Sequence, residues 1–134
     1  MLVVDASVLV VALADDGPDG DAARSRLTGE TLAAPELVDL EVASVLRRQN
    51  RLGTIDDRRT GLALADLAAL QMHRAAHLVL LPRCWELREN LTTYDSAYVA
   101  LAEILDATLL TGDARLARAA GLTCTIELLD PLRR

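Results

Sequence analysis

The sequence has 134 residues, of which 51% are hydrophobic and 25% are charged, and this composition is typical of a single globular domain spanning residues 1–134. No apolar stretch reaches the roughly 18–20 residues that a membrane-spanning helix needs, so we expect no membrane association. All 14 basic residues are arginine, against 20 acidic residues and a net charge of −6, and the absence of lysine excludes P-loop nucleotide sites and enzymes that form a lysine Schiff base.

The first half of the chain predicts two strands and four helices. Short apolar runs without polar alternation are typical of strands buried on both faces, and they occur at residues 2–4 and 31–34. Longer segments with helical periodicity predict helices over residues 8–14, 19–27, 36–52 and 54–70.

Capping residues support several of these helix boundaries. Asp5 or Ser7 can cap the first helix, because a side-chain oxygen at that position accepts a hydrogen bond from a free backbone N–H. Thr54, followed three residues later by Asp57, resembles a capping box. In the helix over residues 36–52, the apolar side chains expected to face the core are those of Leu37, Leu40, Val45 and Leu46.

The second half continues the alternation of strands and helices. Apolar runs predict strands at residues 77–81, 108–110 and 123–126, and helices are predicted over residues 84–89, 92–105 and 114–120. This alternation indicates an α/β fold with a short, mostly parallel central sheet flanked by helices.

Two acidic residues directly follow predicted strands. Asp5 comes after the run at residues 2–4, and Asp113 comes three residues after Leu110. Because ligands of open parallel sheets bind beyond the carboxyl ends of the strands, both carboxylates are candidates for one site. The alternative for each is helix capping, since each also precedes a predicted helix.

Two further acidic residues lie on predicted helices. Glu41 is four residues from both Leu37 and Val45, so it shares their face and lies either at the rim of the core or toward a polar site. Asp95 follows Thr92 in a Thr-x-x-Asp pattern, which fits a capping box but also places Asp95 near the sheet edge.

Together these four carboxylates come from four separate segments that can converge on one pocket, with Ser7 and Thr111 as flanking hydroxyls. Four clustered carboxylates repel one another unless cations lie between them. Oxygen-only donors suit Mg²⁺ or Mn²⁺. Such a site is suited to hydrolysing a phosphodiester bond.

Four motifs in chain order carry a resemblance to a known family. They are Val3-Val4-Asp5-Ala6-Ser7, Glu41 within a mid-chain helix, the segment from Tyr94 to Glu103, and Leu109-Leu110-Thr111-Gly112-Asp113. The set resembles the PIN domain, and in particular the small bacterial VapC toxins of VapBC toxin–antitoxin modules. The resemblance covers nearly the whole chain and is most specific over residues 91–116.

The resemblance implies a PIN-like domain that acts as a metal-dependent endoribonuclease, cuts RNA and thereby inhibits translation. The residues that would hold Mg²⁺ or Mn²⁺ and act in catalysis are Asp5, Glu41, Asp95 and Asp113. Thr111 and Ser7 would support them.

Two partners are also implied by the resemblance. The family usually forms homodimers, and a cognate VapB-type antitoxin wraps the toxin and places a basic or aromatic side chain at the acidic pocket. Some members carry a further acid shortly after the last one, whereas this chain has Arg115 there, so the number of metal ions stays open.

A cluster of arginines is a candidate RNA-contacting surface. Five arginines and two aspartates lie between residues 47 and 59, and the planar guanidinium binds phosphate well. The candidate contacts are Arg47, Arg48 and Arg51, with a solvated helix face as the alternative.

Two other functions remain open at this point. One is a non-catalytic interaction module in which the acids serve as helix caps and the fold binds a protein or RNA. The other is a metal-dependent nuclease acting on DNA. The cysteines, Cys84 and Cys124, form no disulfide framework, and the N-terminus does not resemble a signal peptide, so we expect a cytoplasmic protein.

Overall fold

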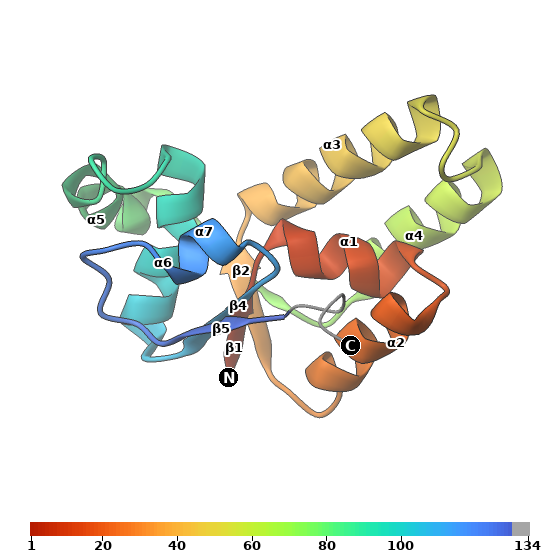
Figure 1. Ribbon diagram of the computed structural model, residues 1–134. Helices are drawn as coiled ribbons and strands as arrows, with labels where there is room; N and C mark the ends of the chain where they lie inside the picture. Colours follow the sequence, from red (N-terminus) through yellow and green to blue (C-terminus); the bar gives the residue numbers. More distant parts are fainter. Residues whose placement is uncertain (130–134) are drawn as a thin grey trace.

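The computed structural model describes residues 1–129 and contains one five-stranded, fully parallel sheet (Figure 1). The strand order is β3-β2-β1-β4-β5. The strands are β1 Leu2–Val4, β2 Leu32–Pro35, β3 His73–Ala75, β4 Thr108–Thr111 and β5 Ile126–Leu128. In the central register, Val3 is opposite Ala33 on one side and Leu109 on the other. The predicted α/β class is confirmed.

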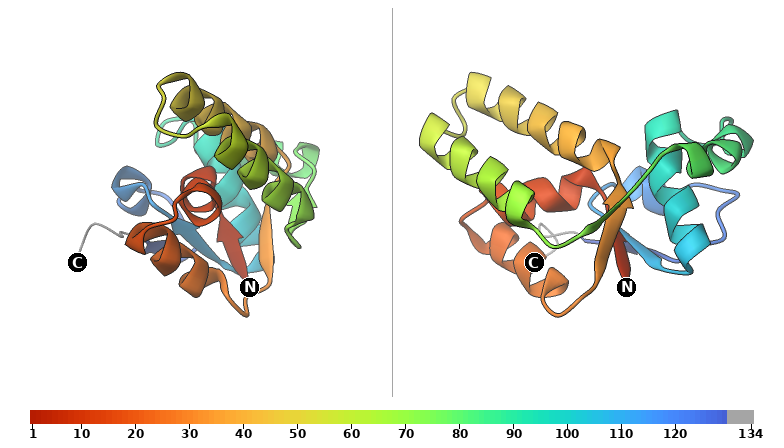
Figure 2. Two further views of the ribbon diagram at one scale, coloured as in Figure 1. Left: turned by 90° about the vertical axis from the view of Figure 1, so that its right-hand side faces the viewer. Right: turned by 180° about the vertical axis from the view of Figure 1, so that it is seen from behind.

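Seven α-helices surround this sheet within residues 1–129. Their bounds are α1 Ala6–Ala14, α2 Pro18–Leu27, α3 Leu37–Arg51, α4 Asp57–Ala69, α5 Leu81–Glu86, α6 Thr93–Leu105 and α7 Ala114–Ala117. The helix α6 packs on one face of the sheet, against β1, β2 and β4, while α1 and α2 lie on the other. Helices α3 and α4 form a hairpin that packs on α1 and projects away from the sheet (Figures 1 and 2).

The core explains why the central strands are continuously apolar. Helices cover both faces of the sheet, so every side chain of β1 is buried, and Leu109 and Leu110 of β4 are fully buried. The apolar run of β1 ends at Asp5, whereas β4 ends with the buried Thr111.

The predicted strand over residues 77–81 is wrong. The strand β3 lies at His73–Ala75, and Leu78–Leu80 form a 3₁₀ turn that leads into α5. Pro82 sits in the first turn of α5, where its missing N–H costs nothing. The apolar run misled the prediction because Leu78 and Val79 are exposed on the surface rather than buried in the sheet.

Several smaller expectations also need correction. The cap of α4 is Asp56, and the Thr54 hydroxyl instead donates to the Gln49 carbonyl. Leu40 is 77% exposed, because the buried stripe of α3 consists of Val38, Val42 and Leu46. The remaining shifts are at element ends: α5 begins three residues earlier than predicted, α7 ends at residue 117, and β5 spans residues 126–128.

Within the described residues, none of the helices has both the length and the apolar character that a membrane span requires.

Candidate active site

The carboxyl edge of the sheet brings the predicted acidic residues into one region. Asp5 follows β1 directly, and Asp113 lies two residues beyond the end of β4. The helix that follows β2 carries Glu41, and the first turn of α6 carries Asp95. Because β1, β2 and β4 are parallel neighbours, the segments that leave their carboxyl ends start from the same edge.

Asp5 is the buried centre of a hydrogen-bond network. It is only 8% exposed. The hydroxyl of Ser7 donates to Asp5 Oδ1 at 2.6 Å, and the hydroxyl of Thr111 donates to Oδ2 at 2.5 Å. The Val8 backbone N–H also donates to Oδ1, so Asp5 caps α1 as well. The two proposed roles of Asp5, helix cap and site residue, are therefore compatible.

The same hydroxyls fix the loop after β4. The Asp113 N–H donates to Thr111 Oγ1 at 3.0 Å, and the Gly112 N–H donates to Ser7 Oγ at 2.9 Å. Gly112 suits this close approach, since a Cβ there would lie 3.1 Å from Ser7 Oγ, tighter than an ordinary contact. The predicted supporting hydroxyls, Ser7 and Thr111, thus bind the ends of β1 and β4 together.

Glu41 lies at the edge of the buried stripe of α3, facing α6. Its neighbours Leu37 and Val45 are half-buried, as a position at the rim of the core requires. The hydroxyl of Tyr98, a buried residue of α6, donates to Glu41 Oε1 at 2.5 Å. This hydrogen bond joins two segments that are 57 residues apart in the sequence.

Asp95 has the cap geometry expected from its sequence pattern. Thr92 Oγ1 accepts a hydrogen bond from the Asp95 N–H at 3.1 Å, so Thr92 caps α6. The Asp95 side chain is half-buried, and its negative charge acts on both Asp5 and Glu41.

Electrostatic coupling identifies three acids as a group. Burial raises the pKa of Asp5, and the negative charge of Asp95 raises it further. The hydrogen bonds that Asp5 accepts lower this pKa but do not cancel the effect of burial. Burial likewise raises the pKa of Glu41, and the negative charges of Asp95 and Asp5 raise it further. The hydrogen bond from the Tyr98 hydroxyl acts in the opposite direction and lowers this pKa. These three carboxylates therefore interact electrostatically.

Asp113 stands apart from this group. Arg115 Nη2 lies 3.1 Å from Asp113 Oδ2, and Arg115 Nε donates to Oδ1 at 3.3 Å. This hydrogen-bonded pairing holds the pKa of Asp113 below its ordinary value. Asp113 also accepts the Arg115 backbone N–H at 2.9 Å and so caps α7.

The carboxylates of Asp5, Glu41 and Asp113 are thus each engaged by donors of their own. Over residues 1–129, no three His, Cys, Asp or Glu side chains are gathered closely enough to form a complete set of metal ligands. The donor chemistry nevertheless suits a hard divalent cation, because only carboxylate and hydroxyl oxygens line this edge.

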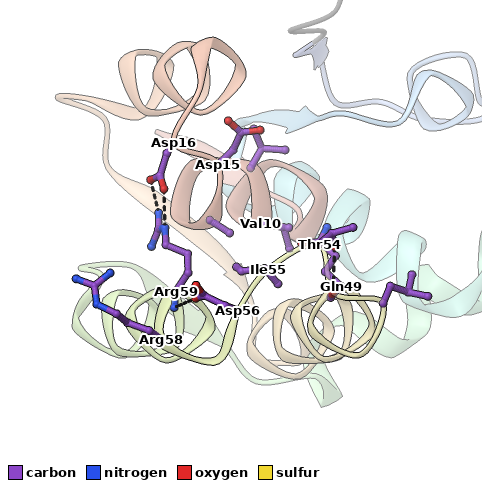
Figure 3. A pocket seen from close by; sticks show the side chains of 12 residues that line it. Val10, Asp15, Asp16, Gln49, Thr54, Ile55, Asp56, Arg58 and Arg59 are labelled. Atoms are coloured by element: carbon purple, nitrogen blue, oxygen red, sulfur yellow. Dashed lines mark hydrogen bonds and ion pairs between the residues drawn. The ribbon is translucent and has the colours of Figure 1, made fainter.

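A groove lies away from these acids. It has a volume of about 730 Å³ and runs between α1 and the α3–α4 hairpin. Figure 3 shows Arg59 of α4 reaching across to Asp16, at a distance of 2.9 Å. The groove is lined by the carboxyl-terminal end of α1, whereas Asp5 caps the opposite end of that helix, so the groove and the acidic site are separate.

Comparison with known proteins places this fold in a family. Residues 2–122 match the PIN domain. The chain belongs to the PIN-domain family. Within the family it is of the VapC type: it is 44% identical to ribonuclease VapC1 of Mycobacterium tuberculosis over 128 residues, which cover 95% of this chain and 96% of that protein. It is 43% identical to VapC ribonuclease Mb0985 of Mycobacterium bovis over 132 residues, covering 96% and 98% of the two chains.

A solved structure agrees with the PIN fold. It is that of VapBC2 from Rickettsia felis bound to a DNA fragment from the promoter of that module. The similarity covers 96% of this chain and 98% of the other, with a TM-score of 0.69 and 16% sequence identity. At that identity the agreement concerns the fold alone.

Two side chains of this PIN domain were not predicted to take part in the site. Tyr98 was recognisable, because a buried tyrosine needs a hydrogen-bond partner and Tyr98 lies one turn after Asp95 on the same helix face. Arg115 was noted only as standing where some family members have an acid. Its pairing with Asp113 depends on the turn that begins α7 and carries no sequence signal of its own.

Proposed function

We propose that this VapC-type PIN domain is a metal-dependent endoribonuclease that acts as a toxin by cutting RNA and inhibiting translation. The observation that carries the proposal is the meeting of Asp5, Glu41 and Asp95 at the carboxyl edge of one parallel sheet, where burial and the neighbouring acids raise the pKa values of Asp5 and Glu41. Buried like charges are costly to gather, and a bound cation is the ordinary reason to do so. The named ribonucleases at 43–44% identity over nearly the whole chain support the same activity.

Mg²⁺ or Mn²⁺ is the proposed cofactor, held by Asp5, Glu41 and Asp95, with Asp113 joining when it turns from Arg115. Such a cation would polarise the attacking water and neutralise charge on the phosphate. Ser7 and Thr111 hold Asp5 in place, and Tyr98 does the same for Glu41. Hydroxyl donors of this kind orient carboxylates and keep them ionised.

The proposed reaction is hydrolysis of one phosphodiester bond. A carboxylate of the site accepts a proton from water while the water oxygen bonds to phosphorus. The bond from phosphorus to one ribose oxygen breaks, and that oxygen keeps the electron pair and takes up a proton. One product ends in a phosphate monoester and the other in a hydroxyl group.

The α3–α4 hairpin supplies the proposed RNA-contacting surface. In the described part of the chain, five arginines take part in no ion pair, and four of them lie on or beside this hairpin: Arg47, Arg48, Arg51 and Arg58, with Arg118 as the fifth. Because Arg48 lies seven residues after Glu41 on the same side of α3, it is about 10 Å further along the helix. The proposed contacts of these unpaired guanidinium groups are therefore with phosphates a few nucleotides from the acids.

The proposed partners follow from the VapC type. A cognate VapB-type antitoxin would neutralise the toxin, and the acidic site is suited to receive a basic side chain from it. We also propose a homodimer and a cytoplasmic location, where the RNA substrate is found. A non-catalytic module is not favoured, because relatives over nearly the full length of the chain are named ribonucleases.

The test is incubation of purified protein with total bacterial RNA and Mg²⁺ or Mn²⁺, with and without chelator. Asp95→Asn removes a charge from the site, and Asp106→Asn is the matched control because Asp106 is exposed at the opposite end of α6. We expect the wild type and Asp106→Asn to cut the RNA at discrete positions. We expect these cuts to be abolished by chelator and by Asp95→Asn. Equal cutting by all three proteins, or none by the wild type, would contradict the proposal.

A further inference from the structure

Arg115 is the only cation that contacts any of the four acids in residues 1–129. Its side chain spans both oxygens of Asp113, at 3.3 Å from Nε and 3.1 Å from Nη2. Its charge also acts on Asp95, although the two are not hydrogen-bonded. The guanidinium is therefore bonded to Asp113 and lies close enough to Asp95 for the two charges to interact.

This ion pair is loosely held. The Arg115 side chain is 84% exposed, and solvent screening makes exposed ion pairs weak. A guanidinium forms the same two-pronged hydrogen bonds with a phosphate as with a carboxylate. A phosphate that approaches the acids can consequently replace Asp113 as the partner of Arg115 with little loss.

The approaching RNA needs a cation at this position. The unpaired arginines of α3 begin two turns beyond Glu41, so they are placed to contact flanking nucleotides rather than the phosphate at the acids. A phosphate at the acids faces three coupled carboxylates and one exposed guanidinium. Among residues 1–129, that guanidinium is the one cationic side chain in contact with any of the four acids, and it can offset the repulsion.

We propose that Arg115 is a substrate-contacting residue that exchanges Asp113 for the phosphate being cleaved, an inference that rests on the proposed ribonuclease function. In the RNA-bound protein, Arg115 donates two hydrogen bonds to non-bridging phosphate oxygens. There it neutralises the negative charge that grows on them as water adds to phosphorus. Asp113 is released in the same movement.

RNA binding in chelator tests the contact without any metal. Binding of a fluorescent RNA oligonucleotide is followed by anisotropy for the wild type, Arg115→Ala, Arg115→Lys and the control Arg118→Ala. Arg118 is exposed just after α7 and has no ion pair in the described structure. We expect Arg115→Ala to bind about 3–10-fold more weakly, with a salt dependence reduced by about one charge. Arg118→Ala is expected to change binding less than about twofold.

Cleavage at saturating Mn²⁺ provides the second readout. Arg115→Ala is expected to lower kcat by about 100–1,000-fold, with partial recovery in Arg115→Lys, since loss of one charge-stabilising donor costs on this scale. The thermal midpoints of all variants are compared to show that they are folded.

Two results would overturn the inference. If Arg115→Ala matches Arg118→Ala in both RNA binding and kcat while the wild type cuts RNA, then Arg115 only pairs with Asp113, and the ribonuclease proposal stands without it. If the wild type makes no chelator-sensitive cuts, the ribonuclease proposal fails and takes this inference with it.

Discussion

Replacing Tyr98 by phenylalanine isolates one hydrogen bond of the site. The ring stays buried in α6, and only the hydroxyl that donates to Glu41 is removed. A hydrogen bond to a charged acceptor contributes about 1.5–3 kcal/mol to stability. Because Glu41 is half-buried and water can replace part of that bond, we expect Tyr98→Phe to lower the free energy of unfolding by about 1–2 kcal/mol.

The pH dependence of this loss has a definite sign. The Tyr98 hydroxyl stabilises ionised Glu41 and so lowers its pKa against the effect of burial, which raises it above the ordinary value of 4.5. The difference between wild type and Tyr98→Phe is therefore full at pH values above the pKa of Glu41. It shrinks as pH falls through that pKa, because protonated Glu41 no longer gains from the hydroxyl donor.

Thermal unfolding of the two proteins measures the effect directly. For a chain of this length, the expected loss corresponds to a fall in Tm of roughly 3–8 °C near neutral pH. Tyr94→Phe is the matched control, because Tyr94 lies on the same helix but is exposed and makes no hydrogen bond through its hydroxyl in the described structure. Its Tm is expected to stay within about 1–2 °C of the wild type.

Function should respond in the same direction. Residues that orient metal-binding carboxylates typically change metal affinity or activity by about 10–100-fold when they are removed. We expect the Mn²⁺ affinity measured by isothermal titration and the rate of RNA cleavage to fall on that scale for Tyr98→Phe. Both quantities are expected to be unchanged for Tyr94→Phe. Equal Tm, Mn²⁺ affinity and cleavage rate in the two variants would refute the assignment of Tyr98 as the residue that holds Glu41.

Three further predictions concern Asp5, its hydrogen-bond donor Thr111, and the helix glycines Gly20 and Gly61. Asp5→Asn should abolish cleavage yet leave Tm unchanged or higher near neutral pH, since burial disfavours the charge; this gain should disappear below the ordinary pKa of 3.8. Thr111→Val leaves a buried Asp5 oxygen without its donor, so urea unfolding should show a loss of about 1–3 kcal/mol. Gly20→Ala puts a Cβ 1.8 Å from the Asp15 carbonyl oxygen and should destabilise by more than about 2 kcal/mol, whereas Gly61→Ala, with open space around it, should stabilise by up to about 1 kcal/mol.

The central strands and their acids were predictable because they depend on local patterns. A continuously apolar run followed by Asp5 indicates both that β1 is buried and where the strand ends. The run before Thr111 does the same for β4. Since neighbouring parallel strands end at the same edge, the placement of Asp5 near the end of β4 follows from the fold class alone.

The edge strand β3 could not be predicted in this way. Its residues are only partly buried, and its second residue, Arg74, is polar. Its position is fixed by contacts distant in sequence: the Glu36 N–H donates to the Ala75 carbonyl, and Arg74 forms a two-pronged ion pair with Asp39 of α3. The three residues of β3 carry no local sequence pattern that predicts these distant partners.

The partners of the acids were unpredictable for the same reason. Periodicity placed Glu41 at the rim of the core, but the hydroxyl that meets it comes from another helix. The pattern after β4 gave the position of Asp113 as the cap of α7, but not its engagement by Arg115. Sequence thus located the carboxylates, while tertiary structure decided which of them act together.

The net charge of −6 is a poor guide to what this surface can bind. Seven arginines in residues 1–129 are already paired with acids, as in Arg26 with Glu127 and Arg83 with Glu103, and such pairs contribute little to the field outside. The charge that is not neutralised in ion pairs is distributed unevenly: coupled carboxylates lie at the sheet edge, and unpaired guanidinium groups lie along α3. Under the proposed function, RNA would be attracted by the hairpin and repelled by the acids, so the acidic edge would accept a phosphate only when positive charge is brought to it. The need for a cation at this edge therefore arises at substrate binding, before any bond is broken.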